Sequence, residues 1–194
     1  ITATNPRNCK PYIFKTPHQS ELKRQLKSKL WEVALSTSAA PLFFPIVSIE
    51  SHYLVDGGLW ANNPSMVALT EAIGPYFKKD ISDVSILSVG NISSCSALQN
   101  YRNLKKGLTG WRQNVVTLTL DAQSTHAHLS MEQIFQRDKK RYYRVEDKVE
   151  DPEQLKTLSQ LDNVAEDNLK HLIARGEQLA SEFAVKDVFK HYFS

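Results

Sequence analysis

One carboxylate of this sequence, Asp56, stands where it could act as a general base. It ends the hydrophobic run HYLV (52–55) and is followed at once by Gly57 and Gly58. Asp-Gly and Gly-Gly pairs are strong turn formers, so by themselves they favour a β-hairpin. A capped helix follows instead of a second alternating strand. Asp56 is therefore expected at the carboxyl end of a strand, where ligand sites gather in open α/β sheets.

The helix after the glycines is predicted from its capping residues. Asn63 suits the N-cap, Pro64 suits the first turn, and apolar residues recur at helical spacing from Met66 until Gly74 ends the pattern. The two glycines would allow backbone or substrate to come close to the acid without a Cβ in the way.

Predicted strands and helices alternate along the rest of the chain, which indicates an α/β layered fold. β-Branched and aromatic runs predict strands at 1–4, 11–16, 42–49, 84–90 and 141–147. Helical spacing predicts helices at 21–35, 110–135 and 164–183. The continuous apolar run at 84–90 is typical of a buried parallel strand.

Two of these helices have further features. The helix 21–35 is basic and amphipathic, and the small residues of STSAAP (36–41) are expected to end it. The last helix is expected to begin with Asn163 and Glu166 as a capping pair. Its apolar stripe is predicted to include Leu169, Leu172, Ile173, Gly176, Leu179 and Phe183.

Composition limits the class of protein. The 194 residues are 41% hydrophobic and 23% charged, which suits one globular domain or a large part of one. The net charge of +3 is spread along the chain without an arginine-rich block, so a nucleic-acid partner is not expected. Cys9 and Cys95 lack metal-ligand spacing, which favours a reducing, cytoplasmic location. No stretch approaches the roughly 20 apolar residues of a membrane-spanning helix.

The opening residues ITATN (1–5) read as a strand already under way, and the only methionines are Met66 and Met131. We therefore expect this chain to be the C-terminal part of a longer protein.

Four stretches together resemble the patatin-like phospholipases, or lipid acyl hydrolases. They are KLWEVALSTSAAPLFFP (29–45), YLVDGGLWANNPSMVALTEA (53–72), ILSVG (86–90) and, more loosely, YYRVED (142–147) with the closing helix. The T-S-A-A-P, D-G-G and N-N-P elements in this order are a far more specific signal than D-G-G alone.

The resemblance implies a three-layer α/β/α fold with a mainly parallel central sheet. Residues 1–194 would be the C-terminal portion of a single catalytic domain. In the family, the aspartate of D-G-[GA] pairs with the serine of a G-x-S-x-G elbow, and by resemblance Asp56 is that aspartate. The residues that would shape the site around it are Gly57, Gly58, Asn62, Asn63, Thr37 and Ser38.

The chemistry of such a dyad requires a basic carboxylate. A serine hydroxyl becomes nucleophilic when a base within about 2.6 to 3.2 Å accepts its proton. An aspartate with a pKa of roughly 3.9 is a poor base at neutral pH, so we expect partial desolvation to raise it. The apolar run LFFPIV (42–47) could provide that environment and line an acyl-chain channel, or could simply be core.

The sequence departs from the family pattern in one respect. It contains no G-x-S-x-G and no glycine-rich oxyanion element. Ser88 has Ile86 where the first glycine of an elbow should stand, and Ser36 and Ser38 lie in a segment without an elbow. In the family both missing elements lie N-terminal to this region, so we expect this chain alone to be inactive.

Three readings follow. The leading one is a lipid acyl hydrolase of phospholipase A type acting through the Ser-Asp dyad, without cofactor or metal, because His126 and His128 lack further ligands. Its partner would be a phospholipid or other acyl lipid, with peripheral membrane contact through the basic helix left open. The alternatives are a non-catalytic lipid- or partner-binding module and a nucleotide-activated bacterial phospholipase effector.

Overall fold

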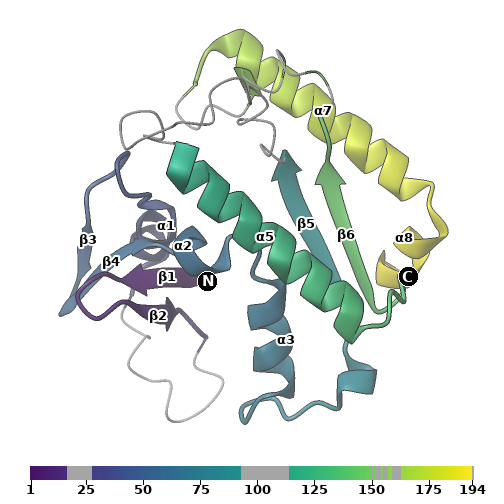
Figure 1. Cartoon of the computed structure of the whole chain (residues 1–194), viewed down its shortest axis with the longest axis horizontal. Coiled ribbons are helices and arrows are strands. Elements are labelled where there is room, and N and C mark those ends of the chain that lie inside the picture. The colour runs from purple at the N-terminus through teal and green to yellow at the C-terminus, as the bar shows by residue number, and fades with distance from the viewer. Residues whose placement is uncertain are drawn as a thin grey trace, which may run out of the picture.

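The computed structural model describes residues 1–16, 28–92, 114–149, 151, 154, 157–158 and 163–193 (Figure 1). The strands are β1 (Thr2–Asn5), β2 (Lys10–Ile13), β3 (Val47–Ile49), β4 (His52–Asp56), β5 (Ile86–Ile92) and β6 (Tyr142–Asp147). The helices are α1 (Leu30–Ser38), α2 (Gly58–Ala61), α3 (Ser65–Ile73), α5 (Asn114–Ile134), α7 (Glu166–Ala184) and α8 (Asp187–Phe193), with a 3₁₀ turn η2 (Ile81–Asp83).

A four-stranded sheet in the order β2-β1-β4-β3 carries the acidic motif. All three strand pairs are antiparallel, and Ala3 of β1 lies opposite Asp56 of β4. β4 is an inner strand, and its Leu54 is completely buried. This sheet and α1 share one apolar core, formed by Ala3, Phe14, Val33, Ile49 and Leu54. The core therefore holds the strand that ends at Asp56.

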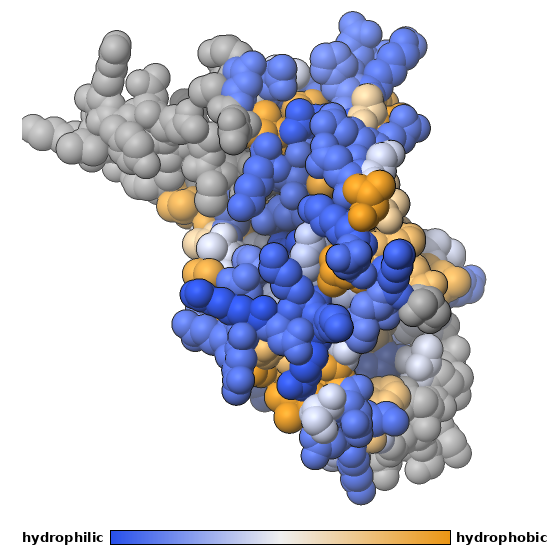
Figure 2. Space-filling model, turned by 90° about the vertical axis from the view of Figure 1, so that its right-hand side faces the viewer, coloured by the Kyte–Doolittle hydropathy of each residue, from blue (hydrophilic) through white to orange (hydrophobic). Residues whose placement is uncertain are grey.

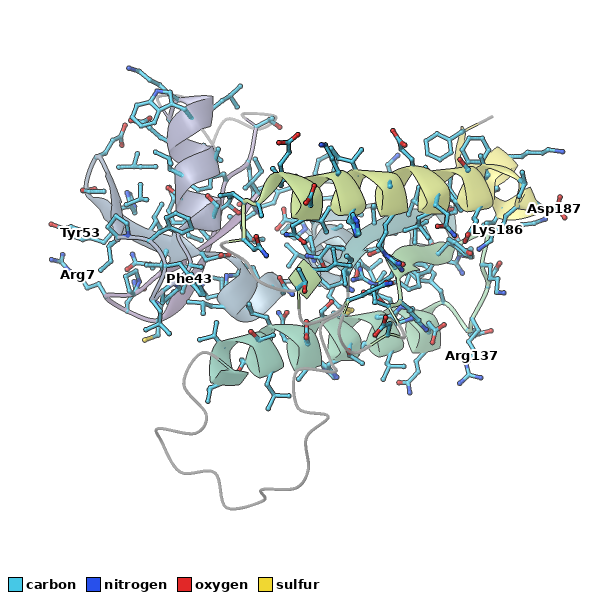
Figure 3. The ribbon with its side chains drawn as sticks, turned by 90° about the horizontal axis from the view of Figure 1, so that it is seen from above. Arg7, Phe43, Tyr53, Arg137, Lys186 and Asp187 are labelled. Carbon is cyan, nitrogen blue, oxygen red and sulfur yellow. The ribbon has the colours of Figure 1, made fainter. Side chains whose placement is uncertain are left out.

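The second sheet is the parallel pair β5 and β6, which lies between α5 and α7 (Figures 1 and 3). It has a core of its own with α3 and α5, formed by Leu69, Val84, Met131, Phe135 and Tyr142. The helix, sheet and helix of this part form three layers. The predicted α/β class and the predicted parallel strand within 84–90 are both confirmed.

The four-stranded sheet differs from the mainly parallel sheet that the resemblance implied. β1 and β2 are joined by a short turn, and so are β3 and β4. Parallel neighbours need a crossover of about a dozen residues or more, whereas antiparallel strands can be joined by a tight turn. Within the described residues, parallel pairing is limited to β5 and β6, which are separated by α5.

The segment around STSAAP also differs from the prediction. Residues 21–27 of the predicted basic helix lie outside the described part of the chain. α1 continues to Ser38, and the Ser36 and Ser38 hydroxyls donate to carbonyl oxygens of the preceding turn, both at 2.8 Å. The predicted strand 42–49 is confirmed only at β3. Pro41–Phe44 form a turn, in which the Phe44 amide donates to the Ala40 carbonyl at 3.0 Å.

The predicted face of the last helix is partly wrong. The N-cap of α7 is Ala165, and its amide donates to the Asn163 side-chain oxygen at 3.1 Å. The predicted capping pair of Asn163 and Glu166 is therefore not formed at the N-cap. Phe183 is buried as predicted, whereas Leu169, Ile173 and Gly176 are exposed. The side chains turned toward the sheet include Arg175, which pairs with Asp147 of β6 through two hydrogen bonds of 2.6 and 2.8 Å.

Figure 2 shows the face that carries the C-terminal helix α8 as largely hydrophilic, with hydrophobic residues in separate small groups. Among the helices that the structure describes, none combines the length and the apolar character needed to cross a membrane.

Candidate active site

The backbone of Asp56 is held from two sides at the end of β4. Its amide donates to the carbonyl of Ala39 at 3.0 Å, and its carbonyl accepts the Thr4 hydroxyl at 2.8 Å. Ala39 belongs to the T-S-A-A-P element, and Thr4 lies on β1. The predicted strand and helix are confirmed as β4 and α3, and a short helix α2 that was not predicted begins between them at Gly58.

The carboxylate of Asp56 has one oxygen engaged. Its Oδ1 accepts the Gly58 amide at 2.6 Å, and no second hydrogen bond to it is found within the described residues. The side chain is half-buried, and burial raises the pKa of the carboxyl above its ordinary value. The Gly58 hydrogen bond opposes this shift because it favours the charged form. The direction is the one expected for a general base.

The two glycines leave space for their neighbours. Neither has a positive φ. A Cβ on Gly57 would collide with the backbone carbonyl of Thr2 on β1. A Cβ on Gly58 would lie 3.0 Å from Asp56 Oδ1 and 3.3 Å from the side-chain oxygen of Asn62. Gly57 is therefore required by the close approach of β1, whereas a Cβ at Gly58 would press on the Asp56 carboxylate, which would have to shift.

The N-N-P element (62–64) connects α2 to α3 and is hydrogen-bonded to α5. Asn62 donates its amide to Gln123 at 2.8 Å and its side-chain amide to the Leu120 carbonyl at 3.3 Å, both on α5. Asn63 lies one residue before the N-cap of α3, which is Pro64 and not Asn63 as predicted. The Asn63 side chain accepts a hydrogen bond from the Ser65 amide, two residues later, at 3.2 Å. This is the geometry of an Asx turn.

Thr37 and Ser38 are placed differently. The Thr37 hydroxyl donates to the Thr2 carbonyl at 2.6 Å, so it braces the β1 residue that faces Gly57. The Ser38 hydroxyl is bonded within its own helix and is exposed. Trp60 of α2 adds a further link to β1, since its Nε1 donates to the Ala3 carbonyl at 2.9 Å.

Two grooves flank the motif without reaching the carboxylate. One, of about 680 Å³, is lined mostly by apolar side chains, which include Leu42, Phe44, Ile46, Val55, Leu59 and Trp60. Successive side chains of a strand point to opposite faces, so Val55 rather than Asp56 faces this groove. The other, of about 490 Å³, is lined by Thr37, Pro64, Val67, Ala68, Phe77 and residues of β1 and β2. An acyl-chain role for 42–47 stays a prediction.

Among the hydrogen bonds of the described residues, none joins a histidine to Asp56. His52 begins β4, at the opposite end of the strand, and its ring is tilted against Tyr12 with 5.1 Å between ring centroids. The His128 ring is 3.1 Å from the Tyr142 hydroxyl, and His126 is exposed. In the described part of the chain, no three acidic, histidine or cysteine side chains gather as metal ligands would.

Sequence reasoning assigned no role to Arg144. This residue lies in the predicted strand 141–147, and its side chain is only 7% exposed. It donates to the buried Ser88 hydroxyl at 2.7 Å, and Ser88 is no nucleophile elbow. Strand alternation was the available signal, since Arg144 shares a face of β6 with the buried Tyr142.

Known proteins resemble the chain across this site. The family model described as Patatin-like phospholipase matches residues 2–69. The chain is 33% identical over 206 residues to an Escherichia coli protein named cGAMP-activated phospholipase. The aligned region covers all of this chain and 58% of that protein. A Vibrio cholerae protein of the same name is 33% identical over 200 residues, covering 96% of this chain and 56% of that protein.

An Arabidopsis thaliana protein named Probable inactive patatin-like protein 9 is 32% identical over 126 residues, covering 59% of this chain and 32% of that protein. Residues 2–69 thus match the patatin-like phospholipase family, as the motifs indicated, and the two bacterial relatives are similar along nearly the whole chain. It spans a little more than half the length of the two bacterial relatives.

The raised pKa of Asp56 predicts a stability effect with a definite sign. A carboxyl whose pKa is higher in the folded state than in the unfolded state destabilises the fold when it is ionised. Asp56→Asn should therefore raise the melting temperature at pH 7. The difference from the parent should shrink as the pH falls through the folded-state pKa, and vanish below the unfolded value near 3.8. Thermal unfolding followed from pH 7 to pH 3 measures this.

Asp80 provides a control of opposite sign. Hydrogen bonds from Ser82 lower the pKa of the Asp80 carboxyl, so Asp80→Asn should lower the melting temperature at pH 7 and lose that effect in acid. A lower melting temperature for Asp56→Asn at pH 7 would contradict the assigned balance of burial and hydrogen bonding.

Proposed function

We propose that this chain is the aspartate-bearing, C-terminal part of a patatin-like domain that hydrolyses acyl esters of membrane lipids. The observation that carries the proposal is the Asp56 carboxylate. It is half-buried at the end of β4, its pKa is raised, and one oxygen is fixed by the Gly58 amide. The match of residues 2–69 to the patatin-like phospholipase family supports the reaction class, and the bacterial relatives are named phospholipases.

In the proposed reaction Asp56 is the general base. Oδ1 is held by the Gly58 amide, so Oδ2 is the oxygen we assign to the serine proton. The serine Oγ then attacks the ester carbonyl, and the proton held on Asp56 passes to the departing alcohol oxygen. Water, activated by the same carboxylate, releases the fatty acid. The serine and the oxyanion donors belong to residues N-terminal to this chain in the proposal.

Replacing the proposed base tests the assignment directly. In the full-length protein, Asp56→Asn keeps the side-chain volume and removes proton acceptance, so kcat should fall by roughly 10²- to 10⁴-fold, the loss typical of an acid/base group. Hydrolysis of a nitrophenyl ester and of phospholipid vesicles measures it. Gly58→Ala should also lower kcat, because its Cβ would press on Oδ1. Parental rates in both variants would show that Asp56 is not the base. No hydrolysis by the parent protein itself would favour the non-catalytic binding module.

The chain by itself is expected to show no ester hydrolysis above background. It holds the proposed base but neither a nucleophile elbow nor a glycine-rich oxyanion element. The assay uses purified 1–194, with circular dichroism to confirm that it is folded. Turnover that Asp56→Ala abolishes would show that another nucleophile lies within this chain.

Nucleotide activation is a second candidate function, which the names of the bacterial relatives favour. If it applies, the full-length protein should hydrolyse phospholipid slowly alone and much faster with added cGAMP. Asp56→Asn should remain inactive with the nucleotide present. Equal rates with and without cGAMP, at nucleotide concentrations up to millimolar, would exclude cGAMP as the activator and leave the hydrolase proposal intact.

A cytoplasmic location, with peripheral contact at the membrane, completes the proposal. The free, exposed thiol of Cys9 is compatible with a reducing compartment.

A further inference from the structure

Arg144 of β6 is a buried cation with several partners. Its side chain is 7% exposed, and its Nη2 lies 2.6 Å from the Glu146 carboxylate. The same guanidinium donates to the Ser88 hydroxyl on β5 at 2.7 Å and to the Ser124 hydroxyl on α5 at 3.3 Å. A buried charge is tolerated only when it is paired and hydrogen-bonded, so this group has been built into the protein interior.

The guanidinium is connected to the loop that follows Asp56. The Ser88 hydroxyl accepts a hydrogen bond from Arg144 and donates one to Asn63 Oδ1 at 3.5 Å. The same Asn63 oxygen accepts the Ser65 amide and the Ser65 hydroxyl, while Asn63 Nδ2 donates to the Ser124 carbonyl at 3.2 Å. Asn63 is 2% exposed, so these bonds are shielded from water. Arg144 and Asn63 therefore meet both β5 and α5.

Gly90 on β5 gives independent support for the placement of the guanidinium. A Cβ at Gly90 would lie 2.5 Å from Arg144 Nη2, 2.9 Å from its Cζ and 3.1 Å from Glu146 Oε1. Real Cβ contacts are not this short, and the φ of Gly90 is not positive. The glycine is therefore needed for space, and the space is occupied by the ion pair.

We propose that Arg144 is a positioning residue for the Asp56 site, acting through Ser88 and Asn63 on the loop 57–65. This inference rests on the proposed function for its catalytic consequence. The loop carries Gly58, whose amide holds Asp56 Oδ1 at 2.6 Å. When the anchor at Asn63 is loosened, the loop loses its fixed path and the carboxylate loses its fixed direction.

Lysine cannot replace arginine in this role. The planar guanidinium presents five donors in a fixed fork, and here it reaches Ser88, Ser124 and Glu146 at the same time. An ammonium group at the end of a shorter chain would keep the charge near Glu146 and release at least one hydroxyl. Arg144→Lys thus separates the positioning function from simple charge pairing.

The experiment compares two perturbing variants with two matched controls in the full-length protein. Gly90→Ala displaces the guanidinium without touching Arg144, and Arg144→Lys removes the fork. Gly176→Ala makes the same change where a Cβ meets nothing within 4 Å. Arg175→Lys alters another arginine–carboxylate pair on β6, with Asp147, for which the structure gives no contact to the loop.

Two measurements are made on each variant. Ester hydrolysis gives kcat and KM per folded molecule, and hydrogen exchange followed by mass spectrometry reports on the amides of 57–65. For Gly90→Ala and Arg144→Lys we expect kcat to fall about tenfold or more with KM nearly unchanged, because small displacements of a reacting group are costly. Exchange of 57–65 should become faster. The double variant should be no worse than the poorer single one.

Several outcomes would overturn the inference. Parental kcat in Gly90→Ala, with Asp56→Asn inactive, would show that the ion pair does not position the base. Unchanged exchange at 57–65 would show that it does not anchor the loop. Equal losses in Arg175→Lys would make the effect merely structural. If Gly90→Ala fails to fold, Ser88→Ala carries the same test, since it removes only the connecting hydroxyl.

The proposed function can fail separately. If Asp56→Asn retains full activity, Asp56 is not the base. The kcat values of the other variants then do not test the role of Arg144. Hydrogen exchange at 57–65 still decides whether the ion pair anchors the loop.

Discussion

The antiparallel pairing of β1 with β4 is the constraint on which the rest of the site depends. It puts Ala3 opposite Asp56 and brings the Thr2 carbonyl so close to Gly57 that no Cβ fits between them. Thr37 and Trp60 donate to carbonyls of the same strand β1, so α1 and α2 are fixed to it as well. Two strands, two helices and a glycine turn thus determine where one carboxylate can lie.

Burial at the site has an energetic cost, because the carboxylate and the guanidinium both lose water. The protein offsets the two costs differently. Arg144 is neutralised by Glu146 and hydrogen-bonded by two hydroxyls, so it can serve as a rigid anchor. Within the described residues, the Asp56 carboxylate accepts one hydrogen bond, from the Gly58 amide, and burial raises its pKa. The charge of Arg144 is thus offset by several partners, whereas that of Asp56 is offset by one.

The two apolar cores are joined near the site by polar contacts. One core belongs to the four-stranded sheet with α1, and the other to α3, α5 and the parallel pair. Asn62 and Asn63 connect them, with bonds to Leu120, Gln123 and the Ser124 carbonyl on α5. Directional hydrogen bonds specify one relative placement where apolar packing alone would accept several.

Local chemistry was sufficient to predict much of this molecule. The strand that ends at Asp56, the need for glycine directly after it, the helix closed by Gly74 and the parallel strand that begins at Ile86 all follow from spacing and side-chain type. β5 is less buried than predicted, since Val89 is 74% exposed. The predicted face of the last helix was wrong because a neighbouring element decided the outcome. Leu169 and Ile173 are exposed because α7 presents another face to β6.

The sequence by itself therefore determined the resemblance to patatin-like phospholipases and the local order of strand and helix around Asp56, since these depend on residues close together in the chain. Only the tertiary structure decided the antiparallel sheet around Asp56 and the burial that raises its pKa. It also decided the burial of Arg144 among Ser88, Ser124 and Glu146. Each of these depends on groups that are distant in sequence, such as Arg144 and Ser88, and their contact exists only after the chain has folded.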